Sequence, residues 1–225
     1  MKKYLRFIFA AFVAALCFTA CQSTESSRAV AAQQTQASYR PYHGQRSPIV
    51  VGKFGNRSDF MRGIFSDGED RLGGQAKTIL MTHLQQSNRF SVLDRDNMVE
   101  ANWEASVRGE EQNIMGASYI ITGDVTEFGR KEVGDMQLFG VLGRGKKQVA
   151  YSKVSLYVVN IKTTELMYSV QGAGEYELSD REILGFGSTS TYDSTLNGKV
   201  LDLAVREAVD RLSEGMDMGL WGPRN

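Results

Sequence analysis

From residue 48 onward, apolar residues recur in some segments with the spacing of a strand and in others with the spacing of a helix. This pattern predicts strands that alternate with helices. Strand-like runs rich in Val, Ile and aromatic residues occupy residues 48–54, 90–93, 119–125 and 149–161. In the longest run, Val154, Leu156 and Val158 share one face, as the two-residue repeat of a half-buried strand requires. The polar residues 162–165 (KTTE) then make a turn into the apolar segment 166–170, so these last two strands form a hairpin.

Three segments have helical spacing instead. They cover residues 69–86, 94–107 and 201–212. In the last of them the apolar residues form one stripe and the charged residues another, and we expect Gly215 to end this helix. In the second, Asp94 or Asp96 is placed to cap the helix, and we expect Trp103 to be a packing residue. Strands interleaved with helices plus one hairpin predict an α/β domain over residues 48–225, with a mixed sheet flanked by helices.

The first 20 residues follow a different pattern. A basic start (MKKYLR) precedes an uninterrupted apolar run at residues 7–16, which at 1.5 Å per residue is too short to span a bilayer core of about 30 Å. The run ends in residues 18–21 (FTAC), which resemble a bacterial lipobox. That resemblance implies cleavage between Ala20 and Cys21, a lipid thioether on Cys21 and acylation of the new amino terminus with a palmitate-like chain. An ordinary secretory signal that leaves Cys21 as a free thiol is the alternative.

Residues 21–47 are then expected to be a lipidated, flexible tether, because they are rich in Gln, Ser, Ala and Thr and have no apolar period. Gln22 is not the aspartate that retains lipoproteins in the inner membrane, so we expect an outer-membrane protein. The 26 basic and 26 acidic residues of the full chain give no basic excess, which argues against a nucleic-acid partner. Loss of residues 1–20 removes Lys2, Lys3 and Arg6 and leaves a mildly acidic body.

The sequence lacks the motifs of common enzyme and metal sites. It contains no Gly-x-Ser-x-Gly elbow, no phosphate-binding Walker loop and no His-Glu-x-x-His helix. His43 and His83 lie 40 residues apart without a third candidate ligand, and we expect both to be solvated. We therefore predict no catalytic residue, no metal and no cofactor, and a hydrolase is the least favoured class.

Four stretches of the body resemble the curli secretion lipoproteins of the CsgG type. They are residues 89–95 (RFSVLDR), 116–125 (GASYIITGDV), 154–166 and 215–221 (GMDMGLW). The resemblance implies an outer-membrane lipoprotein that faces the periplasm and forms a homo-oligomeric ring, with curli-like fibre subunits or accessory assembly proteins as partners. It also implies two membrane β-hairpins per subunit, which would fall at residues 129–151 and 169–196, and an aromatic pore constriction, for which Phe60 and Phe65 are candidates.

The sequence supports such a pore only in part. Val133, Phe139 and Val141 share a parity, but Asp135 and Gln137 interrupt it, whereas membrane strands alternate apolar and polar positions over about 9–11 residues. Ordered loops in these places, and aromatic residues that pack on their own domain, are the alternatives. The functional hypothesis is a passive export channel or assembly component. Its rival is a periplasmic adaptor or envelope-maintenance lipoprotein that binds a partner without conducting anything.

Overall fold

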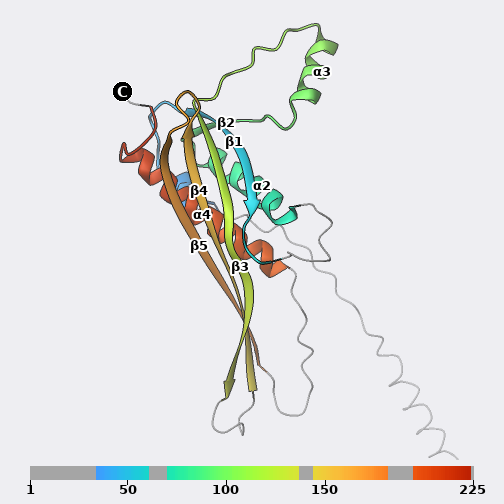
Figure 1. The fold of residues 1–225 in the computed structure, drawn as a ribbon, viewed down its shortest axis with the longest axis vertical. Coiled ribbons are helices and arrows are strands. Elements are labelled where there is room, and N and C mark those ends of the chain that lie inside the picture. The colour runs from blue at the N-terminus through green and yellow to red at the C-terminus, as the bar shows by residue number, and fades with distance from the viewer. Residues whose placement is uncertain (1–33, 61–69, 137–143, 182–194, 224–225) are drawn as a thin grey trace, which may run out of the picture. The chain divides into compact units, whose positions relative to one another are not determined.

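The computed structural model describes residues 34–60, 70–136, 144–181 and 195–223; within these ranges the side chains of residues 132–148 and 178–197 are not described. A five-stranded mixed sheet with the strand order β2-β1-β3-β4-β5 forms the body (Figure 1). Its strands are β1 (Ser47–Asn56), β2 (Phe90–Leu93), β3 (Tyr119–Met136), β4 (Arg144–Asn160) and β5 (Leu166–Arg181). The predicted α/β class with a mixed sheet is confirmed.

The pairing directions follow the connections between the strands. β1 lies parallel to both β2 and β3, and helical segments connect these strands as parallel pairs require. β3, β4 and β5 are antiparallel neighbours. In the expected turn at residues 162–165, the Asn160 side chain accepts hydrogen bonds from the backbone N–H groups of Lys162 and Thr163.

One face of the sheet is covered by helices. α2 (Arg71–Gln86) begins at Asp70, whose carboxylate accepts a hydrogen bond from the Gly73 N–H at 2.8 Å. α4 (Thr195–Asp217) lies along β4 and β5 and contacts α2. Its stripe of buried residues meets Ile49, Ile121 and Val158 of the sheet to form the core. Within the described residues no helix covers the opposite face (Figure 1).

Two expectations about α4 and α2 were wrong. Gly215 lies inside α4, which continues to Asp217. A Cβ atom at Gly215 would lie 2.6 Å from the Tyr168 ring, so this glycine permits close packing of helix on strand. His83 is buried, and its Nε2 lies 2.8 Å from a carboxylate oxygen of Asp202, which joins α2 to α4.

The strands β3, β4 and β5 run past the part of the sheet that the helices cover. Beyond Tyr176, which receives the Lys199 ammonium over its ring, the ladder continues through Met136↔Arg144 and Gly145↔Arg181. We call residues 132–136, 144–148 and 178–181 the three-stranded extension. Apolar periodicity did not reveal it, since only the strand segments nearer the core have the alternation of a half-buried strand.

Candidate functional surfaces

A buried arginine joins three distant parts of the body, and we call this arrangement the Arg89 clamp. The Arg89 side chain is almost fully buried just before β2. Its Nε and Nη2 donate to the Asp217 carboxylate at 2.9 and 2.7 Å, and its Nη1 donates to the carbonyls of Ala37 and Ser87 at 2.9 and 2.8 Å. A buried guanidinium is tolerated when its donors are satisfied in this way.

An aromatic cluster continues the clamp into the core. The Trp221 ring stacks on Phe90 at 5.8 Å and on Tyr168 at 6.4 Å between ring centroids, and meets Tyr119 edge-on at 5.7 Å. Its Nε1 donates to the Leu212 carbonyl at 3.0 Å, which satisfies the one polar atom of the buried indole. The C-terminal segment is thereby fixed to β2, β3 and β5.

The clamp also holds the segment that precedes β1. Residues Gln36–Tyr39 form a short 3-10 helix, η1, whose first two N–H groups donate to the Asp210 carboxylate of α4. Arg40 pairs with Glu214 one turn further along α4. The compact body therefore begins at Gln34, and residues 34–46, which composition assigned to the tether, pack in part against α4.

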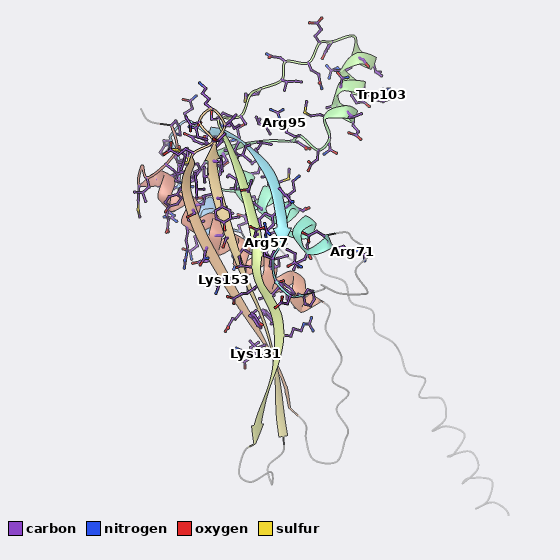
Figure 2. The ribbon with its side chains drawn as sticks, in the orientation of Figure 1. Arg57, Arg71, Arg95, Trp103, Lys131 and Lys153 are labelled. Carbon is purple, nitrogen blue, oxygen red and sulfur yellow. The ribbon has the colours of Figure 1, made fainter. Side chains whose placement is uncertain are left out.

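The helix α3 (Met98–Arg108) buries none of its residues. Figures 1 and 2 show α3, with Trp103 on it, set apart from the body at the end of two connections. Trp103 is 63% exposed, so the expectation that it packs in the core was wrong. The amphipathic pattern correctly predicts a helix, but the expected cap at Asp94 or Asp96 was wrong, because α3 begins after Asn97. Its apolar stripe has no partner within the described part of the chain.

The connections on both sides of α3 are nevertheless well defined. Asp94 accepts hydrogen bonds from the backbone of Asp96 and Asn97, and a hydrogen bond from the Asn97 side chain lowers the pKa of Asp94. Arg95 donates to the Met115 carbonyl at 2.6 Å across the base, and Gly109, with a φ of 69°, ends the helix. We call residues 94–117 the α3 arm.

An open groove of about 530 Å³ lies at the opposite edge of the sheet. Tyr157 of β4, Tyr168 and Gln171 of β5, and Arg211 and Met218 at the end of α4 line it, among others. β5 is the last strand of the sheet, so the groove runs beside an edge strand. We call it the β5-edge groove. Its aromatic and thioether side chains give apolar contacts, Ser155 and Ser169 add polar groups, and Arg211 and Glu214 contribute a cation and a carboxylate.

Comparison with known proteins shows the family to which the chain is related. The family model described as "Curli production assembly/transport component CsgG" matches residues 30–224. The chain belongs to the CsgG family. It is also 60% identical, over 93% of its length and 94% of the relative's, to NMB1126/NMB1164 of Neisseria meningitidis serogroup B, which is named as a lipoprotein.

Solved structures resemble this CsgG-family chain more distantly. The PelC dodecamer from Paraburkholderia phytofirmans has 14% identity and a TM-score of 0.35, covering 76% of this chain and 91% of its own. The lipoprotein GNA1162 from Neisseria meningitidis has 15% identity and a TM-score of 0.36, covering 75% and 99%.

Three of the four CsgG-like stretches of the sequence build the clamp and the aromatic cluster. Residues 89–95 supply Arg89 and Phe90, residues 116–125 supply Tyr119, and residues 215–221 supply Asp217 and Trp221. Sequence reasoning missed this convergence, because Arg89 and Asp217 are 128 residues apart and no local pattern links them. The one signal in the sequence was Arg89 itself, a charged residue directly before the apolar strand 90–93.

The predicted site residues lie in different places. Ala20, Cys21 and Phe65 lie outside the described residues, as do parts of the predicted hairpins 129–151 and 169–196. Phe60 is half-buried, and its ring lies 4.6 Å from that of Phe128, centroid to centroid. Its role in a constriction stays a prediction. His43 is exposed, as expected.

Two features are absent from the described residues. No helix there is both long enough and apolar enough to cross a membrane. No group of three or more His, Cys, Asp or Glu side chains there is arranged to hold a metal ion.

Proposed function

We propose that this CsgG-family chain is a lipid-anchored assembly component of a curli-type secretion apparatus. In this proposal it faces the periplasm from the outer membrane and works as a homo-oligomer that handles fibre-forming protein subunits. The observation that carries the proposal is the family match over residues 30–224, which spans every helix and strand of the body. The similarity to a protein named as a lipoprotein supports the anchor at Cys21.

The body would lie close to the membrane surface. About a dozen residues separate Cys21 from Gln34, where the compact body begins. Because an extended chain spans at most about 3.3–3.6 Å per residue, this tether reaches roughly 40 Å. With η1 fixed to α4 by Asp210 and Arg40, the lipid would restrict how far the clamp end of the body can move from the bilayer.

The sequence of the three-stranded extension favours an assembly component over a membrane-spanning wall. Residues 132–136 (EVGDM), 144–148 (RGKKQ) and 178–181 (LSDR) include charged residues at both alternating sets of positions. A strand in the bilayer needs one apolar set, and a lysine or arginine facing lipid at the bilayer midplane costs about 2–4 kcal/mol. We infer that these strand segments lie in water or against another protein.

A passive export channel is the second candidate, and the length of the hairpin favours it. The β3–β4 ladder continues from Tyr119↔Asn160 to Met136↔Arg144, long enough to include strands of the 9–11 residues that a bilayer requires. Conductance of the purified lipidated chain in planar bilayers separates the two candidates. The assembly component gives no single-channel events, whereas reproducible steps of current would favour the channel.

A fibre assay tests the main proposal in the native organism. We expect deletion of the gene to abolish Congo red binding by surface fibres and the wild-type chain to restore it. The Cys21→Ala chain should leave the membrane fraction and restore little, because it lacks the lipid that places the body. Unchanged Congo red binding after deletion would contradict the proposal.

A further inference from the structure

We propose that the α3 arm of one copy docks into the β5-edge groove of a second copy, so that identical subunits join head to tail. This inference rests on the homo-oligomer of the proposed function and adds the two surfaces that form its interface. Four sets of observations carry it: the state of the helix, its charge, the distribution of exposed apolar residues and the place of each surface on the sheet.

The helix itself needs a partner. α3 has 11 residues, and isolated helices shorter than about 12–15 residues are marginal in water. Packing against the body does not compensate, because no residue of α3 is buried. The arm is still a defined element: Arg95 bonds to Met115 across its base, and Lys77 of α2 pairs with Asp96 at 2.5 Å. These contacts hold α3 out from the body, and none of the residues that the structure describes covers its apolar stripe.

The charge of the arm points to a protein partner and away from lipid. Val99, Trp103 and Val107 recur every four residues and form the apolar stripe, while Glu100 and Glu104 lie beside it. Residues 98–111 contain four glutamates and one arginine. Helices that lie on membranes are rich in lysine and arginine on their polar face, and an acidic helix is repelled by anionic lipid.

The exposed apolar residues indicate that the partner is the same chain. Among the described residues, the large exposed hydrophobic side chains form two sets, one on the arm and one around the start of β5 and the end of α4. The first set is Met98, Val99, Trp103, Val107, Ile114 and Met115; the second is Tyr39, Ile161, Leu166, Met218 and Leu220. Two separate apolar surfaces on one chain can cover each other in an assembly of identical copies.

The position of the two surfaces fits a head-to-tail contact. The arm follows β2, which is one edge of the sheet, and the groove lies along β5, which is the other. Both lie toward the same end: the arm returns to Ser118, whose carbonyl accepts the N–H of Ile161 at 3.3 Å. Figure 1 shows α3 and the C-terminal end of α4 on opposite sides of that end. Different surfaces on opposite edges make a heterologous contact, which closes into a ring when the rotation permits.

The chemistry of the two surfaces is complementary. The groove, at about 530 Å³, offers Tyr157, Tyr168 and Met218 as contacts for the indole of Trp103. Arg211 at the rim is more than half exposed beyond its pair with Glu207 and can also meet a glutamate beside the apolar stripe. The carboxylate that lines the groove, Glu214, is paired with Arg40. Docking at this edge would also cover part of β5, whose outer backbone groups have no neighbouring strand in the described sheet.

Photo-cross-linking tests this contact on the full mature chain in detergent. Trp103 is replaced by p-benzoylphenylalanine, the sample is irradiated, and cross-linked peptides are identified by mass spectrometry. We expect intermolecular adducts with residues 155–171 or 211–220. Adducts of the arm with itself would indicate a two-fold contact and overturn the inference, as would adducts only with detergent or lipid.

Mass photometry of matched variants separates the inference from the proposed function. We expect Trp103→Ala to raise the subunit dissociation constant at least about 30-fold, the effect of losing a buried tryptophan anchor. Glu111→Gln, an exposed change in the same arm away from the apolar stripe, should leave it within about twofold. An oligomer that persists unchanged in Trp103→Ala would overturn the arm contact alone. A parent chain that is monomeric throughout would overturn the homo-oligomer as well.

Discussion

At the scale of single residues, the body depends on a charged group in an apolar setting. Arg89 lies beside Phe90 and the Trp221 cluster, and its guanidinium is satisfied by Asp217 and by carbonyls of Ala37 and Ser87. Its cation also lies 5.2 Å from the centroid of the Tyr42 ring. The N-terminal segment, β2 and the C-terminus therefore share one side chain, and the loss of that side chain affects all three.

Replacement of Arg89 tests the clamp. We expect Arg89→Met to lower the free energy of unfolding by about 3–5 kcal/mol, since Asp217 and two carbonyls lose their donor. Urea denaturation at a fixed protein concentration measures this change. Arg40→Met is the matched control, because the Arg40–Glu214 pair is about half exposed and should contribute under about 1 kcal/mol. Similar losses in the two variants would contradict the clamp.

At the scale of helices and strands, the sequence predicted what lies near the core and missed what lies beyond it. Residues 48–54 and 90–93 form β1 and β2 as predicted, because short runs rich in Val, Ile and Phe and bounded by turn residues favour buried strands. Apolar periodicity did not predict the extension of β3 to Met136, because its strand form depends on pairing with β4; only the family resemblance implied a hairpin at residues 129–151. For α3 the apolar periodicity predicted a helix. The pattern within one segment does not show whether the surface that covers its apolar stripe belongs to the same molecule.

Alanine substitutions at two helical glycines should change the stability of the body in opposite directions. Gly215→Ala should destabilise the body by about 1–2 kcal/mol, because the new Cβ would meet the Tyr168 ring at 2.6 Å and overpacking exceeds the gain in helix propensity. Gly74→Ala should stabilise it by about 0.5–1 kcal/mol, because no atom lies within 4 Å of the new Cβ. Thermal unfolding of both variants measures the difference, and a stabilising Gly215→Ala would refute close packing at that site.

At the scale of the whole molecule, the described body has features of a subunit. Within the described ranges no helix lies over one sheet face and no residue covers the apolar stripe of the α3 arm, and the β5 edge carries an open groove. None of these could be read from the sequence, because each depends on which surfaces the fold leaves uncovered. In the proposed function, the lipid anchor at Cys21 would hold such a subunit at a membrane, where copies concentrate in two dimensions.

Cryo-electron microscopy of the lipidated chain in detergent tests the homo-oligomer most directly. We predict closed rings of identical subunits in which the α3 arm of each copy lies on the β5 edge of the next. Particles that remain single subunits at micromolar concentration, with Trp103 exposed to solvent, would contradict the account.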